Sequence, residues 1–233
     1  MLGVVNFGKG NGVVGRLKKL TNLTNLQRLG VTGLTNKEGQ ELCKSIGEFS
    51  RLQQLEVRSD SLEFLIMMDE SAIPRHLVSL RLCGKVSMLP EWINSLNDLA
   101  KVKLLGTELK QEDILCLQNL RNLTLLGLWE NFYIGKSLHF TAGKFPKLKF
   151  LDIDRQPGIQ TIEIENGAMP ELEQLWVNKC PSLHGLSGVQ YLLNLNELLL
   201  KNCGEKRNLI EILQVQVNRH IRRPKFLIGS RFR

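Results

Sequence analysis

The chain has 233 residues, of which 42% are hydrophobic and 23% are charged, a composition that is ordinary for a globular protein. No apolar run approaches the roughly 18 residues that cross a membrane. Residues 1–12 also lack the basic and apolar regions of a signal peptide. These features argue against a membrane-spanning protein, and we expect a cytoplasmic location.

The formal net charge of +8 is concentrated at one end of the chain. Residues 219–233 contain six basic and no acidic residues, so the rest of the chain holds 25 basic and 23 acidic residues. We interpret this end as a basic tail that is either solvated or docked on an acidic partner or nucleic acid. Because no aromatic stacking motif accompanies it, the sequence does not favour RNA or DNA binding.

The dominant feature of the sequence is a leucine pattern that recurs every 22 to 26 residues. Its clearest copy, residues 172–186, has the form L-x-x-L-x-V-x-x-C, with leucines three and six residues further on. Leu175 and Val177 are two residues apart, so both face the same side of a short strand. One unit cannot bury this face alone, so the copies must stack. The first leucines of the eight copies are Leu26, Leu52, Leu77, Leu99, Leu123, Leu148, Leu172 and Leu195.

In chain order, the first clear strand falls within residues 23–34. A helix follows over residues 36–49, with Asn36 as its N-cap and apolar residues at helical spacing. A strand is expected after each later leucine marker. A second, short helix is expected over residues 112–120, and a longer loop over residues 132–144.

The end of the chain differs from the repeats. Residues 205–218 are amphipathic and predict a closing helix. We therefore expect two regions. Residues 1–204 form an α/β leucine-rich-repeat solenoid, a curved horseshoe of about eight repeats that is N-terminally incomplete. Its parallel strands line the concave face, with short helices and loops on the convex face. Residues 205–233 form the closing helix and the basic tail.

A small polar side chain is expected three residues beyond the last inward residue of each strand, where it can bond the backbone of the turn. The matching residues are Asn131, Cys180 and Cys203. The weaker substitutes are Asp60 and Thr107, and the mismatches are Lys85 and Gln156. We therefore expect an irregular solenoid without a continuous side-chain ladder.

Two features that could suggest cofactors are weak. The five cysteines are odd in number and include no C-x-x-C pair, which favours reduced thiols over a disulfide framework or zinc site. The glycine-rich segment between Gly8 and Gly15 matches a dinucleotide fingerprint. It also matches a phosphate loop, except that Gly10 stands where a Ser or Thr is required. No βαβ unit follows, so we interpret this segment as a turn-rich remnant of an earlier repeat and expect no cofactor.

The side chains that alternate with the inward leucines point out from the concave face. They are basic in the first half of the chain, and aromatic and acidic in the second half. Exposed aromatic residues beside charges are typical of a protein-binding hot spot. Alternatively, the rings stack on one another as a solvent-facing surface. The candidate protein-binding residues are Arg58, Arg81, Lys101, Lys103, Trp129, Phe150, Asp152, Asp154, Trp176 and Glu197.

Catalysis receives little support from the sequence. The four histidines lie in four different segments, and none falls at an outward strand position. No nucleophile motif or metal-ligand spacing is present. Asp152 and Asp154 lie two apart on one expected strand, where they are ordinary surface carboxylates. We therefore expect no enzymatic activity and no small-molecule substrate.

Several phrases of the sequence carry a more specific resemblance. They include Leu-Pro-Glu-Trp-Ile within residues 89–104, Phe-Pro-Lys-Leu-Lys within residues 145–154, and Leu-x-x-Leu-Trp-Val within residues 169–183. Together with residues 17–34, they resemble the C-terminal leucine-rich repeats of plant nucleotide-binding leucine-rich-repeat (NLR) resistance proteins. The coiled-coil class of cereals is the most similar, and the resemblance runs over nearly the whole chain.

This resemblance implies a role in plant innate immunity. In that family the repeat module senses a pathogen effector or a guarded host protein and holds a neighbouring ATPase module inactive. The coiled-coil and ATPase modules are absent from this chain, so we expect a fragment or a truncated gene product. One alternative is a free-standing leucine-rich-repeat adaptor or scaffold outside immunity. A second is a nucleotide-binding enzyme that uses the segment between Gly8 and Gly15.

Overall fold

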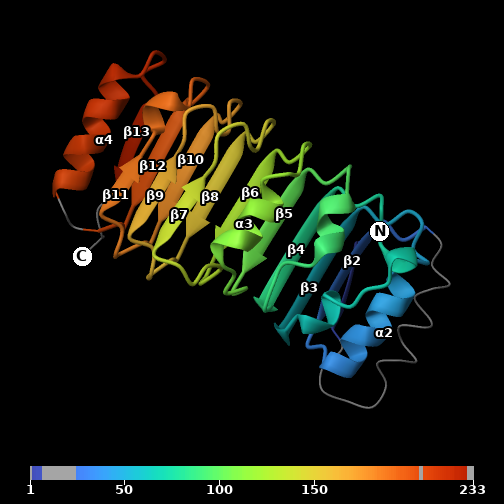
Figure 1. Ribbon diagram of the computed structural model, residues 1–233. Helices are drawn as coiled ribbons and strands as arrows, with labels where there is room; N and C mark the ends of the chain where they lie inside the picture. The colour runs from blue at the N-terminus through green and yellow to red at the C-terminus, as the bar shows by residue number, and fades with distance from the viewer. Residues whose placement is uncertain (1, 7–24, 205–206, 230–233) are drawn as a thin grey trace.

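The computed structural model describes residues 2–6, 25–204 and 207–229. Within these residues, ten strands form one large parallel sheet, in which strands from successive repeats lie side by side (Figure 1). In spatial order they are β1 (Leu2–Asn6), β2 (Arg28–Thr32), β3 (Gln54–Ser61), β4 (Ser79–Lys85), β5 (Lys101–Leu105), β6 (Leu125–Trp129), β8 (Phe150–Asp154), β10 (Gln174–Asn178), β12 (Glu197–Lys201) and β13 (Lys225–Gly229).

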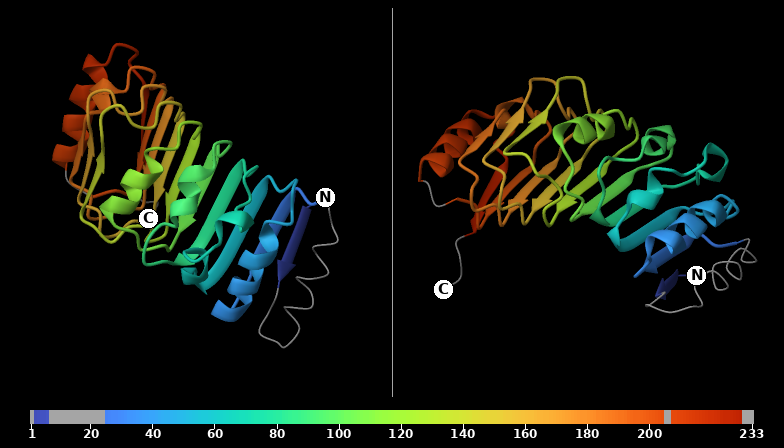
Figure 2. Two further views of the ribbon diagram at one scale, coloured as in Figure 1. Left: turned by 45° about the vertical axis from the view of Figure 1, so that its right-hand side comes forward. Right: turned by 60° about the horizontal axis from the view of Figure 1, so that its bottom comes forward.

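The alternating leucine pattern sets the register of this sheet. Leu151, Leu175 and Leu198 are paired across β8, β10 and β12, and none of them is exposed to solvent. Burial of one such side chain contributes about 1.5–3 kcal/mol. A slip of one residue would turn the whole row to solvent, so the register is strongly specified. The stack bends along its length with the large sheet on the inner side (Figure 2), which confirms the curved α/β solenoid.

The outer, convex layer changes from helix to sheet along the molecule (Figures 1 and 2). Its helical segments are α2 (Asn36–Ile46), η1 (Glu63–Leu65), η2 (Glu70–Ala72), η3 (Glu91–Ser95), α3 (Gln111–Leu117), η4 (Val189–Tyr191) and α4 (Arg207–Arg219). Its strands, β7 (Ser137–Phe140), β9 (Thr161–Ile164) and β11 (Gly185–Ser187), form a second parallel sheet. Residues 132–144 were expected to be a loop. They contain β7 because Leu138 and Phe140 alternate inward and are fully buried.

The N-cap of helix α2 lies one residue earlier than the sequence suggested, and the helix ends at Ile46 rather than at residue 49. The N-cap is Thr35, not Asn36. The Glu38 amide donates to Thr35 Oγ1 at 3.4 Å, and the Thr35 amide donates to Glu38 Oε2 at 2.8 Å. This reciprocal arrangement is a capping box, which satisfies two amides that the helix leaves unpaired.

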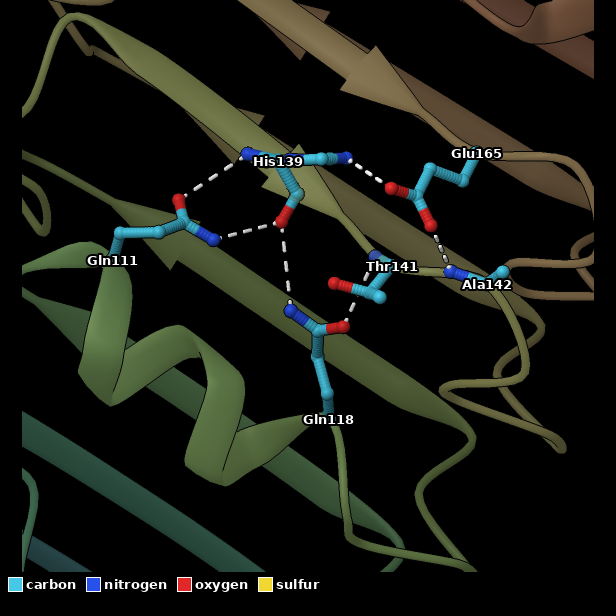
Figure 3. A network of polar contacts seen from close by, with 6 residues as sticks. All are labelled: Gln111, Gln118, His139, Thr141, Ala142 and Glu165. Atoms are coloured by element: carbon cyan, nitrogen blue, oxygen red, sulfur yellow. Dashed lines mark hydrogen bonds and ion pairs between the residues drawn. The ribbon is translucent and has the colours of Figure 1, made fainter.

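Gln111, the first residue of α3, and Gln118, which directly follows the helix, protect the edge of the second sheet, as Figure 3 shows. Gln111 Nε2 donates to the His139 carbonyl at 2.9 Å, and the His139 amide donates to Gln111 Oε1 at 3.2 Å. Gln118 Oε1 accepts from the Thr141 amide at 3.1 Å. Each glutamine amide therefore takes the place of a peptide group on a neighbouring strand. The edge of β7 is covered and cannot pair with another chain.

The opposite edge of the second sheet is protected in the same way. Gln216 on α4 donates from Nε2 to the Leu186 carbonyl at 3.1 Å and accepts from the Val189 amide at 3.2 Å. Side-chain amides from α3 and α4 thus flank the sheet on both sides. They mark the two places where the convex layer changes between helix and sheet.

The turns after β2, β5, β6, β8, β10 and β12 each begin with a residue in the left-handed region. Glycine occupies this position after β2 and β5, at Gly33 (φ 72°) and Gly106 (φ 60°). Later repeats place side-chain-bearing residues there, including Arg155 (φ 55°) and Lys179 (φ 53°). A non-glycine residue in this region costs about 1–2 kcal/mol. The later repeats therefore accept local strain in order to keep the same turn.

The polar position in these turns departs from expectation in two places. Gln156, classed as a mismatch, is buried and donates from Nε2 to the Asp154 carbonyl at 3.2 Å. Asn131, classed as a match, is exposed. Glu130 and Asn131 both have positive φ (49° and 55°), so the chain turns one residue further and Phe132 enters the core instead. Cys180 and Cys203 occupy the expected position, with each Sγ close to a backbone carbonyl.

The large sheet extends beyond the eight expected repeats at both ends. Residues 2–6 form β1, which pairs with β2. Residues 225–229 were assigned to the basic tail, but they form β13, with Phe226 beside Leu198 and Ile228 beside Leu200. The apolar alternation thus continues within this basic segment. The glycine-rich segment between Gly8 and Gly15 lies outside the described residues.

Candidate protein-binding face

The register of the large sheet arranges its outward side chains in three rows that cross the strands. All ten candidate residues occupy these rows. We call this surface the outward face. The first row contains Lys101, Phe150 and Glu197, the second contains Arg81, Lys103, Asp152 and Trp176, and the third contains Arg58, Trp129 and Asp154.

Trp129 joins the basic and acidic halves of the outward face. Its Nε1 donates to Asp152 Oδ2 on β8 at 2.8 Å. On the other side, Lys103 Nζ lies 4.8 Å from the ring centroid and Arg81 Cζ lies 5.7 Å from it. Both cations are within the range of a cation–π interaction. The ring is therefore fixed between cations and a carboxylate, and it does not stack on the other aromatic residues named here.

Gly127 provides the space for this ring. It lies between Lys103 and Asp152 in the second row, two residues before Trp129 on β6. A Cβ added at Gly127 would meet Trp129 Cε2 at 3.2 Å and Lys103 Cγ at 3.3 Å. Such contacts are closer than side chains normally tolerate. The indole lies against the sheet because this position has no side chain.

Asp152 is partly buried by this arrangement. Burial raises the pKa of its carboxyl, and the hydrogen bond from Trp129 and the charge of Lys103 oppose that rise. The neighbouring Asp154 adds to it, because two like charges on one strand disfavour ionisation. Asp152 is therefore a positioned acceptor for the indole.

A second cluster lies towards the C-terminal end of the outward face. Phe150 and Trp176 meet edge to face, with ring centroids 4.8 Å apart and planes at 83°. Trp176 Nε1 donates to Glu197 Oε1 on β12 at 2.8 Å. All three side chains are half-buried. The stacked-ring alternative is therefore seen for this pair, while the rings keep part of their surface accessible.

Three of the remaining candidate charges, Arg58, Arg81 and Asp154, are paired with residues that the sequence did not single out. Glu56 Oε1 lies 3.1 Å from an Arg58 guanidinium nitrogen and 3.6 Å from Arg81 Nε. Asp154 accepts from Asn178 Nδ2 at 2.6 Å, and the Arg155 guanidinium lies 2.8 Å from its other oxygen. Glu56 and Asn178 were recognisable as outward strand residues. Arg155 follows a strand and could not be placed by alternation.

Reactive chemistry is sparse on this surface. Cys83 is an outward residue of the third row, but burial raises the pKa of its thiol, and the hydrogen bond from Arg81 only partly opposes this. Burial also raises the pKa of the Cys43 thiol, to about 12. Neither thiol is activated as a nucleophile. Within residues 2–6, 25–204 and 207–229, no cluster of three or more His, Cys, Asp or Glu side chains could hold a metal.

The repeating strand–turn–cover unit and its rows of outward side chains define a leucine-rich-repeat protein. The family model described as "Leucine-rich repeat region" matches residues 2–225, and the chain belongs to this family. Among the described residues, no helix has both the length and the apolar character to cross a membrane.

Known relatives of the chain are plant disease resistance proteins, as the resemblance predicted. The chain is 34% identical over 165 residues to "Disease resistance protein RPM1" of Arabidopsis thaliana, covering 70% of this chain and 18% of the relative. It is 27% identical over 231 residues to "Disease resistance protein Pik-2" of Oryza sativa subsp. japonica, covering 85% of this chain and 21% of the relative. The chain therefore spans about a fifth of the length of these relatives.

A solved structure supports the fold independently. The structure described as "Crystal structure of TLR13-ssRNA13 complex" superposes with a TM-score of 0.52 and covers 91% of this chain and 37% of that chain. The sequence identity is 16%, so the likeness is one of fold alone.

Proposed function

We propose that this repeat region recognises protein partners through the outward face and does not itself catalyse a reaction. The observation that carries the proposal is the Phe150–Trp176 pair, whose half-buried rings stand on the rigid strands of a parallel sheet. Aromatic anchors held by a rigid scaffold lose little conformational entropy when a partner binds. The second aromatic site, at Trp129, lies between fixed charges on the same face.

The relatives named as disease resistance proteins support an immune role for this surface. We propose that the region senses a pathogen effector or a guarded host protein and that it restrains an ATPase module belonging to a longer receptor. The five cysteines are all free thiols, which fits a reducing compartment, and we propose the cytoplasm as the site of action.

The test compares protein capture from plant extract by the intact chain and by the double variant Trp129→Ala/Trp176→Ala. We expect the double variant to lose captured proteins while its thermal unfolding stays nearly unchanged. The matched control is Leu115→Ala/Ile134→Ala, which removes two exposed apolar side chains elsewhere (42% and 57% exposed) and should keep capture.

Capture by the aromatic variant at the wild-type level would contradict the proposal. If the double variant unfolds, the rings belong to the core. The capture test is then repeated with Lys101→Glu in place of the double variant. The Lys101 side chain is exposed on the same face, so changing it should not disturb the packing of the sheet.

A further inference from the structure

The acidic and basic side chains of the outward face differ in whether they have hydrogen-bond or ion-pair partners within the chain. All four of its carboxylates have a donor close by. Glu56 has Arg58, Asp152 has Trp129, Asp154 has Asn178 and Arg155, and Glu197 has Trp176. A carboxylate that already accepts such bonds gains little from a cation on a partner.

The cations of the same face are much less satisfied. Among the described residues, Lys101, Lys201 and Lys225 have neither a hydrogen-bond nor an ion-pair partner for their ammonium groups. Within the described part of the chain, the Lys103 ammonium has the Trp129 ring as its one polar contact. An ammonium carries three donors, so these groups have capacity left for acceptors on another molecule. The sequence suggested a face with a basic half and an acidic half, but its available charge is mainly positive.

One of these free cations, Lys101, lies next to accessible apolar surface. In the first row Lys101 is directly beside Leu125, and Leu125 is beside Phe150. Leu125 and Phe150 are both half-buried. Neighbouring strands are about 4.8 Å apart, so two strand steps from Lys101 to Phe150 span roughly 10 Å. An extended peptide that crosses the strands covers this distance in about three residues.

We propose that the outward face takes an acidic protein segment with an apolar anchor about three residues from a carboxylate. The apolar residue packs on Leu125 and Phe150, and the carboxylate pairs with Lys101. This inference rests on the proposed function, because it names the partner chemistry of the same face. Complementary charge of this kind speeds association and makes it sensitive to salt.

A nucleic acid fits the outward face less well than a protein. Asp152 and Asp154 both lie on β8, two strands away from Lys101 and Lys103 on β5, so a phosphate backbone that crosses the sheet meets fixed negative charge. The aromatic rings are also not arranged as a row of stacking platforms, because Trp129 lies under cations and Phe150 meets Trp176 edge to face. Binding of single strands usually relies on open rings on which bases stack.

The test selects binders to the intact chain from a displayed library of random twelve-residue peptides. We expect enrichment of Asp or Glu about three positions from a large apolar residue, with binding that weakens as salt rises. Lys101→Glu should lower the affinity of these peptides about tenfold, as the loss of one well-placed charge pair would. The matched control, Lys136→Glu, makes the same charge change at an exposed site outside the outward face and should have little effect.

Other outcomes separate this inference from the proposed function. Enrichment of basic or uncharged peptides that need Trp129 and Trp176 would overturn the acidic partner and keep the binding face. Peptides indifferent to Lys101→Glu and to both tryptophan changes would overturn both ideas. A single strand of ten deoxythymidine nucleotides serves as a competitor. If it displaced the bound peptides at a lower concentration than free peptide does, the outward face would bind nucleic acid better than protein, and the proposed protein partner would be wrong.

Discussion

The two halves of the molecule share one inner sheet but are covered in different ways. Over β2 to β5 the convex layer consists of helices, and β3 and β4 are lengthened by a register shift between Arg58 and Ser61. Over β8 to β12 the cover is a second parallel sheet, and every inner strand has five residues in unbroken register. The inner row of leucines therefore determines the fold, while the convex layer can be either helical or a second sheet.

The outward face reflects the same division. The candidate residues of the helix-covered half are cations, and those of the sheet-covered half are aromatic rings and carboxylates. Trp129 on β6 joins them, at the point where the cover changes from α3 to β7. The boundary between the two halves is thus also the centre of the candidate binding surface.

The largest expected effect tests whether the inner sheet is common to both halves. Leu175→Ala and Leu55→Ala each remove a buried leucine at the same inner position, one from each half. Each change should lower the free energy of unfolding by about 2–5 kcal/mol, because it removes apolar burial and leaves a cavity. Urea titration followed by circular dichroism measures both.

The control for this pair is Leu199→Ala, which changes a half-buried leucine on the outward face. Its effect should be clearly smaller. If only one of the two inner changes were costly, the halves would differ in their sheet as well as in their cover.

A middle-sized effect is expected at the boundary between the halves. Gln118→Ala removes a buried side chain that accepts from the Thr141 amide and leaves that amide without its partner. An unsatisfied buried donor costs about 1–3 kcal/mol. Hydrogen exchange should show faster exchange of the Thr141 amide, which directly follows β7, and of the β7 amides beside it. Gln214→Ala, on the exposed side of α4, is the control and should leave β7 unchanged. Equal protection of β7 in wild type and Gln118→Ala would mean that water replaces the glutamine.

The sequence predicted the inner sheet well because its physics is local and periodic. Leu175 and Val177 identify a strand by their spacing alone, and the same spacing placed all ten candidate residues on outward positions. The second sheet was missed because its strands are short and follow turns of irregular length. At β7, the left-handed residues Glu130 and Asn131 shift the pattern by one residue.

The side-chain pairings of the face could not be predicted, because they depend on neighbours about 24 residues away in the chain. Trp129 was expected to be an exposed anchor. Its actual position depends on Gly127 below it and on Asp152 one strand away. Likewise, β13 was not predicted, because basic residues dominate the sequence around its apolar residues Phe226 and Ile228.

The smallest expected effect concerns the charge at this junction. Because burial raises the pKa of Asp152 above its ordinary 3.8, the folded protein holds its proton more tightly than the unfolded chain does. The stability cost of ionising Asp152 is therefore absent below pH 3.8 and appears as pH rises through the raised pKa. Asp152→Asn keeps an acceptor for the Trp129 indole and removes the charge.

Asp152→Asn should accordingly be slightly more stable than wild type at pH 7, by less than about 1 kcal/mol, because solvent screens this partly exposed site. The difference should shrink as the pH falls to 3.5, where the Asp152 carboxyl is mainly protonated and the two proteins differ little in charge at this position. Urea titrations at the two pH values measure it. A gain that is equal at both pH values would come from packing, and a loss at pH 7 would show that Lys103 stabilises the carboxylate more than burial destabilises it. In that case the charge at the boundary would help hold the two halves of the outward face together.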